Sequence, residues 1–186
     1  MATCLTETTI LGIKQSNNKV LNYNIKVKVS CNNNMQLWEY IVTDITYDRL
    51  DALSNFSVEI CETFTESNFI DRGGGKVNDS GQGNCLNNLP ATIHWDKNNG
   101  TIDPNNLNKI TFSFILDGCF EKIPGIVAIK DGDIKNPSDP NLPKCMFGED
   151  EICTPGCNQK PLKQRPPRGT PFSEEEITPI FRSDKK

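Results

Sequence analysis

Alternation of apolar and polar residues is the feature that most constrains how this chain can fold. It is clearest over residues 20–30, where one face carries Leu21, Tyr23, Ile25, Val27 and Val29, and the other carries Asn22, Asn24, Lys26, Lys28 and Ser30. A period of two is typical of a β-strand with one buried and one solvated face. We therefore expect a half-buried antiparallel strand here, with Cys31 continuing the buried phase.

Similar patterns recur along the chain, at residues 36–46, 56–63, 91–96, 109–117 and 125–131, with a less regular one at 5–14. Clusters of Asn, Asp and Gly separate them, as expected of turns. Trp38, Tyr40 and Trp95 fall on apolar faces, so we expect them in the core. The strand over 36–46 is apolar on both faces and is predicted to be central. The sequence thus predicts an all-β fold, an antiparallel β-sandwich or jelly roll of about seven or eight strands.

The character of the chain changes after residue 132. Six of the twelve prolines lie within residues 155–186, and proline fixes φ and lacks a backbone donor, which disfavours regular strands. We expect an N-terminal strand or connector (1–19), a β-sandwich (20–132) and a Cys- and Pro-rich extended C-terminal tail (133–186). The apolar residues Ile177, Ile180 and Phe181 are candidates for docking on a partner, with an unstructured tail as the alternative.

Eight cysteines are many for a chain of 186 residues; they are Cys4, Cys31, Cys61, Cys85, Cys119, Cys145, Cys153 and Cys157. An even number in a polar β-rich chain favours disulfides, with the connectivity left open. Structural zinc sites use closer cysteine pairs, and the only histidine is His94. Half of the cysteines (Cys4, Cys145, Cys153 and Cys157) lie near the chain ends, which predicts cross-links between subunits.

Charge and hydropathy narrow the classes of partner. Residues 160–186 carry seven Lys or Arg and four Asp or Glu, a net charge of +3, which leaves −7 on the remainder of a chain whose total is −4. An acidic body predicts no nucleic-acid partner. No apolar run approaches the roughly 20 residues of a membrane span. The start of the sequence shows no classical signal peptide, so we expect a chain already processed or exported by another route to the extracellular space, or to the spore or cell surface.

Residues that could carry chemistry are few. His94 shares a strand face with Asp96 and could act as a general base, but no nucleophile motif accompanies it, so a structural or surface histidine and no enzymatic activity are predicted. The glycine-rich stretch at 71–76 lacks the features of a phosphate-binding loop. We interpret it as a flexible loop and expect no cofactor.

Calcium is a minor alternative. Its oxygen ligands would come from Asp131, Asp133, Asn136 and Asp139, whose spacing does not match an EF-hand. We therefore assign no metal-site residues.

Five segments occur in a recognisable order: Trp38-Glu-Tyr-Ile-Val-Thr43, Leu53-Ser-Asn-Phe-Ser-Val-Glu-Ile-Cys61, Ile93-His-Trp-Asp96, Thr111-Phe-Ser-Phe-Ile-Leu-Asp-Gly118 and Gly125-Ile-Val-Ala-Ile-Lys130. Over residues 20–132 the chain resembles a group of poorly characterised bacterial surface or secreted β-sandwich proteins with the pattern WxYxVT … LSHxxxELC … IKWD … FxFxLxG … VAVKxG. It departs at His94, where the pattern has lysine, and in its number of cysteines. The resemblance implies fold and surface location and supplies no catalytic residues.

In architecture alone, the chain is also similar to spore-appendage subunits. Together these features predict a structural subunit of a disulfide-stabilised bacterial surface assembly, fibre-like or spore-appendage-like. It would self-associate into a homopolymer through its terminal segments. The alternative is an adhesin or carbohydrate-binding module in which Trp38, Tyr40 and Trp95 stack on sugars.

Overall fold

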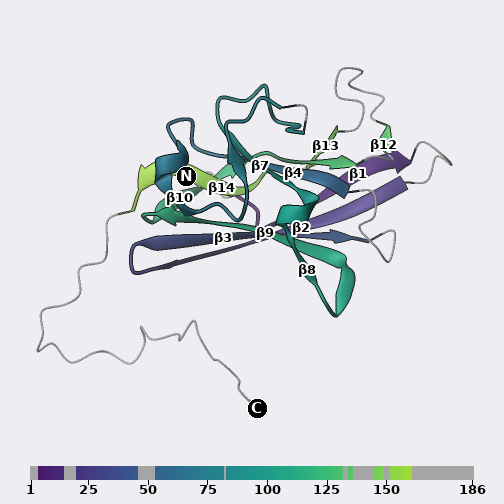
Figure 1. Cartoon of the computed structure of the whole chain (residues 1–186), viewed down its shortest axis with the longest axis horizontal. Helices are drawn as coiled ribbons and strands as arrows, with labels where there is room; N and C mark the ends of the chain where they lie inside the picture. Colours follow the sequence, from purple (N-terminus) through teal and green to yellow (C-terminus); the bar gives the residue numbers. More distant parts are fainter. Residues whose placement is uncertain are drawn as a thin grey trace, which may run out of the picture.

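The structure, a computed structural model, describes residues 4–14, 20–45, 53–81, 83–131, 134–135, 145–148 and 151–160. Antiparallel strands dominate these residues and confirm the predicted all-β class (Figure 1). The strands are β1 (Glu7–Lys14), β2 (Val20–Asn32), β3 (Met35–Asp44), β4 (Leu53–Glu59), β5 (Phe69–Asp71), β6 (Lys76–Val77), β7 (Thr92–Asp96), β8 (Thr101–Asp103), β9 (Asn106–Asp117), β10 (Phe120–Gly125), β11 (Val127–Asp131), β12 (Ile134–Lys135), β13 (Cys145–Phe147) and β14 (Ile152–Gln159). Two 3-10 helices, η1 (Glu66–Asn68) and η2 (Lys97–Asn99), connect strands.

The strands form three sheets. The seven-stranded sheet has the order β12-β1-β2-β3-β9-β5, with β8 also paired to β9; the five-stranded sheet has the order β13-β11-β4-β7-β6; and β10 pairs with β14. Within the largest sheet, Trp38 of β3 lies opposite Val29 of β2 and Phe114 of β9. The prediction of a central strand at 36–46 is therefore confirmed.

Aromatic side chains of the two larger sheets meet in one core. Phe56 of β4 lies 5.7 Å from Tyr40 and 5.1 Å from Phe112, measured between ring centroids, and Trp95 of β7 lies 6.0 Å from Phe114. Such pairs add about 0.5–1.5 kcal/mol each beyond the area they bury. Trp38, Tyr40 and Trp95 are fully excluded from solvent, as their alternation predicted.

The alternation over residues 20–30 is also confirmed, since Leu21, Tyr23, Ile25 and Val27 are buried. The burial weakens towards the end of β2, where Val29 is partly buried and Cys31, which was expected to continue the buried phase, is exposed. Its sulfur is bonded to Cys119, which precedes β10. A bond to another element, rather than burial, accounts for a cysteine at this position.

One predicted boundary needs a correction. Residues 7–14 form a strand paired with β2 along most of its length, in agreement with the expected N-terminal strand, whereas the expected tail contains β13 and β14, which pair with β11 and β10. Pro155 was expected to prevent a strand, yet it lies opposite Lys122. β14 and β10 form a two-stranded sheet, and the other backbone pairing found for β14 is an isolated bridge between Ile152 and Leu5. Pro155 therefore lies in an edge strand, where a proline is tolerated.

The number of strands exceeds the predicted seven or eight because several are very short. β5, β6, β8, β12 and β13 have two or three residues each. A segment of that length cannot display an alternating pattern, so these strands were invisible in the sequence.

Candidate functional site

All eight cysteines form disulfides within the chain, which confirms the choice of disulfides over zinc. The bonds are Cys4–Cys153, Cys31–Cys119, Cys61–Cys157 and Cys85–Cys145. The expectation that Cys4, Cys145, Cys153 and Cys157 cross-link subunits is therefore wrong for this fold. Its premise was a mobile C-terminal segment, whereas β13 and β14 return to the body and place these thiols beside partners of the same chain.

The strand β14 is held more firmly than any sequence pattern indicated. Two disulfides join it to the body, one to Cys4 and one to Cys61. The buried hydroxyl of Tyr40 donates a hydrogen bond of 3.0 Å to the carbonyl of Cys153. The C-terminal end of the described chain is thus fixed to the N-terminal segment and to the aromatic core at once.

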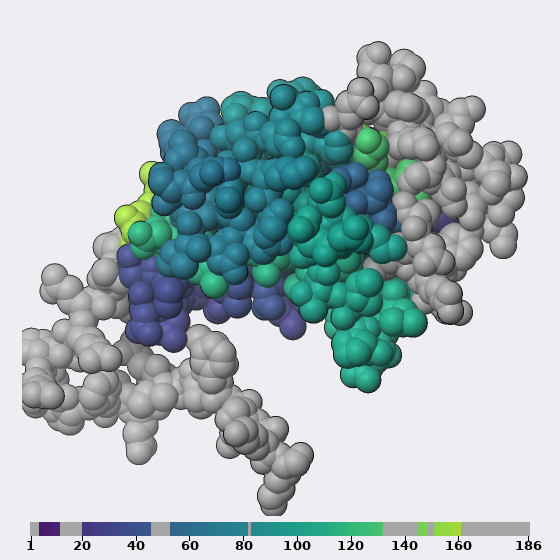
Figure 2. Space-filling model, in the orientation of Figure 1, coloured from purple at the N-terminus to yellow at the C-terminus, as the bar shows by residue number. Residues whose placement is uncertain are grey.

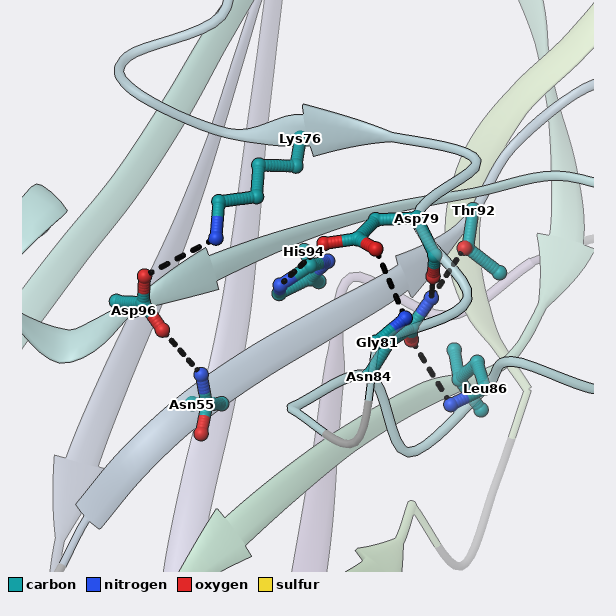
Figure 3. A network of polar contacts seen from close by, with 9 residues as sticks. All are labelled: Asn55, Lys76, Asp79, Gly81, Asn84, Leu86, Thr92, His94 and Asp96. Atoms are coloured by element: carbon teal, nitrogen blue, oxygen red, sulfur yellow. Dashed lines mark hydrogen bonds and ion pairs between the residues drawn. The ribbon is translucent and has the colours of Figure 1, made fainter.

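A cluster of buried polar side chains lies on the face of the five-stranded sheet that points away from the aromatic core (Figure 3). We call it the polar cluster; it consists of Asn55, Ser57, Asp79, Asn84, Thr92 and His94. All except Asp79 are at most 6% exposed. Polar side chains on an outer sheet face normally contact water, so something must cover them.

The cover is the loop formed by residues 78–90. Asn84 Nδ2 donates to Thr92 Oγ1 (2.7 Å) and to the carbonyl of Asp79 (2.9 Å), and the Thr92 amide donates to Asn78 Oδ1 (3.0 Å). The Cys85–Cys145 disulfide ties the same loop to β13, beside buried Leu86 and Ala128. A small second core therefore forms on the outer face and seals the polar cluster.

His94 is the only titratable side chain of the polar cluster that is almost completely buried, with 2% of its surface exposed. Its Nε2 lies 3.6 Å from Asp79 Oδ2. Burial lowers the pKa of His94 below its ordinary value; Asp79 opposes this shift and Lys76 adds to it. Because its pKa is lowered, the buried imidazole is neutral at neutral pH.

The partner suggested for His94 from sequence was wrong. Asp96 shares its strand face but accepts a 2.7 Å hydrogen bond from Asn55 and lies 3.6 Å from Lys76 Nζ. Asp79 takes the place next to the imidazole, and the sequence could not reveal this because the contact depends on how the loop folds over the sheet.

Ser57 was also missed, although it lies directly opposite His94 in the register of β4 and β7. Ser57, His94 and Asp79 are the residue types of a hydrolase triad. However, Ser57 and His94 are both nine-tenths or more buried, and within the described residues neither Ser57 Oγ nor His94 Nδ1 has a hydrogen-bond partner. The arrangement is one of buried polar groups sealed by a loop, without the nucleophile–base hydrogen bond that activation requires.

Beside the polar cluster the surface has a hollow with a volume of about 60 Å³, lined by Asn78, Asp79, Ser80, Asn87, Leu89, Pro90 and Thr92. Small-molecule sites usually have volumes of roughly 300–1,000 Å³. The hollow is large enough for only a few atoms. The described residues, drawn in colour in Figure 2, show no deep cleft on the side that faces the viewer.

The remaining sequence-predicted residues take other roles or lie outside the described residues. Asp131, proposed as a calcium ligand, is buried and accepts a hydrogen bond from Tyr23 Oη. Its proposed co-ligands Asp133, Asn136 and Asp139 are not described, and neither are Ile177, Ile180 and Phe181. Across the described ranges, no three His, Cys, Asp or Glu side chains are grouped as a metal site.

The glycine-rich stretch at 71–76, predicted as a loop, connects β5 to β6, and its Gly75 is buried. Trp95 Nε1 donates a 2.8 Å hydrogen bond to the carbonyl of Arg72. A Cβ on Gly75 would lie 2.6 Å from that indole nitrogen, and one on Gly73, whose φ is +52°, would lie 2.4 Å from the carbonyl oxygen of Ser113. These glycines allow the backbone to approach the core closely.

Comparison with known proteins gives no relative. No model of a known protein family matches the chain, and neither the curated proteins nor the solved structures contain a match. The resemblance to bacterial surface proteins therefore stays a prediction from the sequence.

Proposed function

We propose that this chain is a structural subunit of a bacterial surface assembly, fibre-like or spore-appendage-like, in which disulfides brace each subunit and non-covalent contacts join the subunits. The observation that carries the proposal is the pairing of all eight cysteines within one chain. Disulfides persist outside the reducing cytoplasm. Four of them in one body support a role that needs mechanical and chemical durability.

The disulfides also support resistance to unfolding, including unfolding that starts at the chain ends. They enclose 60 to 149 residues of chain each, and cross-links over such lengths contribute roughly 4–5 kcal/mol apiece in the chain-entropy model. Both ends of the described chain are fixed, since Cys4 and Cys153 are bonded to each other. A subunit that resists unfolding from its ends suits an assembly under load.

The lengths of the outermost strands of each sheet affect how subunits could join. The outermost strands of the two larger sheets are β12, β5, β8, β13 and β6, each with only two or three residues. Short edge strands discourage edge-to-edge pairing. Sheet faces and terminal segments are thus the better candidates for contacts between subunits.

Within the part of the chain that the structure describes, no helix could cross a membrane.

The direct test is the state of the purified full chain in non-denaturing buffer, observed by electron microscopy and by light scattering over a range of concentrations. The proposal predicts extended multi-subunit particles. Dispersed monomers at high concentration would reject it.

The alternative, an adhesin or carbohydrate-binding module, has one observation in its favour, the polar hollow lined by Asp79, Ser80 and Asn87. The aromatic residues suggested for sugar stacking count against it, since Trp38, Tyr40 and Trp95 are all buried in the core. Glycan-array binding by the monomer that disappears in Asp79→Asn and Asn87→Ala variants would favour this alternative.

A further inference from the structure

We infer that one end of the outer face of the seven-stranded sheet binds residues 177–181 of a second copy of this chain. The inference rests on the proposed function and specifies the contact that would join subunits. It begins from a group of apolar side chains on this face, which we call the apolar patch; it consists of Met35, Leu37, Ile70 and Ile115.

The register of the strands places these side chains together. Leu37 of β3 lies directly opposite Ile115 of β9, on the face away from buried Trp38 and Phe114. Met35 is two residues along the same face of β3. In β5, Asp71 is registered with Ile115, and Ile70 directly precedes Asp71 at a shift in the register. Met35 is 43% exposed and Ile70 is 52% exposed, whereas Leu37 and Ile115 are half-buried.

The neighbouring residues on this face are polar. The next cross-strand row holds Lys28, Glu39 and Ser113, so the apolar patch ends where this row begins. An apolar centre bordered by polar residues is the usual anatomy of a protein–protein contact.

The described chain ends beside the apolar patch. The Lys160 amide donates a 2.6 Å hydrogen bond to the carbonyl of Cys119, and the Gly118 amide donates a 2.7 Å hydrogen bond to the carbonyl of Asn34. Asn34 precedes Met35, which is registered with Asp117. β14 therefore finishes at the end of β3 and β9 that carries the patch (Figure 1).

The length of chain beyond Lys160 favours a second copy as the occupant. Residues 161–176 separate Lys160 from Ile177 and include four prolines, Pro161, Pro166, Pro167 and Pro171. In a polyproline conformation, at about 3.1 Å per residue, this spacer would reach about 50 Å. A body of this size has a radius of gyration of about 15 Å and hence a diameter of about 40 Å. A spacer with this reach is long enough to cross the body of one subunit and to place residues 177–181 on the patch of a neighbouring copy.

The chemistry of residues 177–181 suits a sheet face better than a sheet edge. Ile177, Ile180 and Phe181 supply apolar side chains, while Pro179 cannot donate to a strand ladder. A segment of one copy bound to a different surface of the next is a head-to-tail contact. Such contacts generate an open filament when the rotation between copies does not close a ring.

Two variants of the full chain test the inference. The patch variant carries Leu37→Thr and Ile115→Thr, and the segment variant carries Ile177→Ser, Ile180→Ser and Phe181→Ser. A control variant carries Val20→Thr and Leu107→Thr, at side chains that are 57% and 54% exposed outside the patch. Thermal unfolding and non-reducing mass analysis first establish that every variant is folded with four disulfides.

Mass photometry then compares the particle sizes. We expect multi-subunit particles for the unmodified chain and the control, and at least a tenfold loss of them for each test variant. An equal mixture of the two test variants should give dimers and nothing larger, because only the segment variant supplies an intact patch and only the patch variant supplies an intact segment.

The outcomes separate the two claims. If the unmodified chain assembles and the test variants assemble equally well, the inference is wrong and the proposed function stands. If the test variants are monomeric but their mixture gives no dimers, the apolar patch does not bind residues 177–181 of a second copy, and the inference is wrong. If the unmodified chain itself stays monomeric, both the inference and the proposed function are wrong.

Discussion

Removing the Cys85–Cys145 disulfide should affect both the stability of the fold and the titration of His94. The bond closes a separation of 60 residues, so Cys85→Ala with Cys145→Ala should lower the free energy of unfolding by about 4 kcal/mol in the chain-entropy model. Both sulfurs are buried next to Leu86 and Ala128. The loss should be visible as a lower midpoint of urea unfolding.

A matched control separates the general effect of a lost cross-link from the release of the loop. Cys31 and Cys119 are separated by 88 residues, so Cys31→Ala with Cys119→Ala should cost a similar amount, about 4–5 kcal/mol. Only the first pair holds the loop of residues 78–90 over His94. Because His94 is the only histidine, its resonance can be followed by NMR without ambiguity.

Burial is the largest cause of the lowered pKa of His94. When the loop is released, water should reach the imidazole and the pKa should rise towards its ordinary value, while it stays lowered in the control. A stability loss below about 1 kcal/mol for the first variant, or an equal change of the His94 pKa in both, would refute this reasoning.

Three further outcomes follow from the same structure. In the unmodified chain the pKa of folded His94 is lowered, so the unfolded chain takes up a proton first as the pH falls below about 6.5. The free energy of unfolding should therefore decrease by up to about 1.4 kcal/mol per pH unit. His94→Gln should remove this dependence, which urea unfolding at several pH values would measure. Gly75→Ala should lower the free energy of unfolding by about 1–3 kcal/mol, because its Cβ would press on the Trp95 indole; an unchanged melting temperature would contradict this. Tyr40→Phe should cost about 1–2 kcal/mol by leaving the buried Cys153 carbonyl without its donor, to be checked by chemical denaturation; no loss would mean that this carbonyl finds another donor.

The sequence predicted the central part of the fold because the information there is local. The alternation over β2, and the apolar phases of β3 and β9, depend on which face of a single strand meets the core. They correctly placed Leu21 and Trp38 inside.

The C-terminal strands were missed because their signals are not local. β13 has three residues, and β14 contains Pro155, so neither shows a recognisable pattern. Their stability comes from disulfides and from pairing with strands distant in sequence, such as Cys61–Cys157 across 96 residues. No spacing rule could have selected these pairs among the alternatives.

The neighbours of His94 in the polar cluster could not be predicted from the sequence for the same reason. The sequence singled out His94 and a neighbour on its own strand, Asp96. The residues that surround the imidazole, Ser57 and Asp79, come from another strand and from a covering loop. Alternation places a side chain on a face but does not say what will cover that face.

The claim that intrachain disulfides brace subunits joined without covalent bonds has one direct test. Assemblies of the native full chain are dissolved in detergent without reductant and separated by electrophoresis next to a reduced sample. The account predicts that the unreduced sample runs as a monomer, faster than the reduced monomer because its four intrachain bonds keep the unfolded chain compact. Oligomers that only reductant converts to monomers would contradict it.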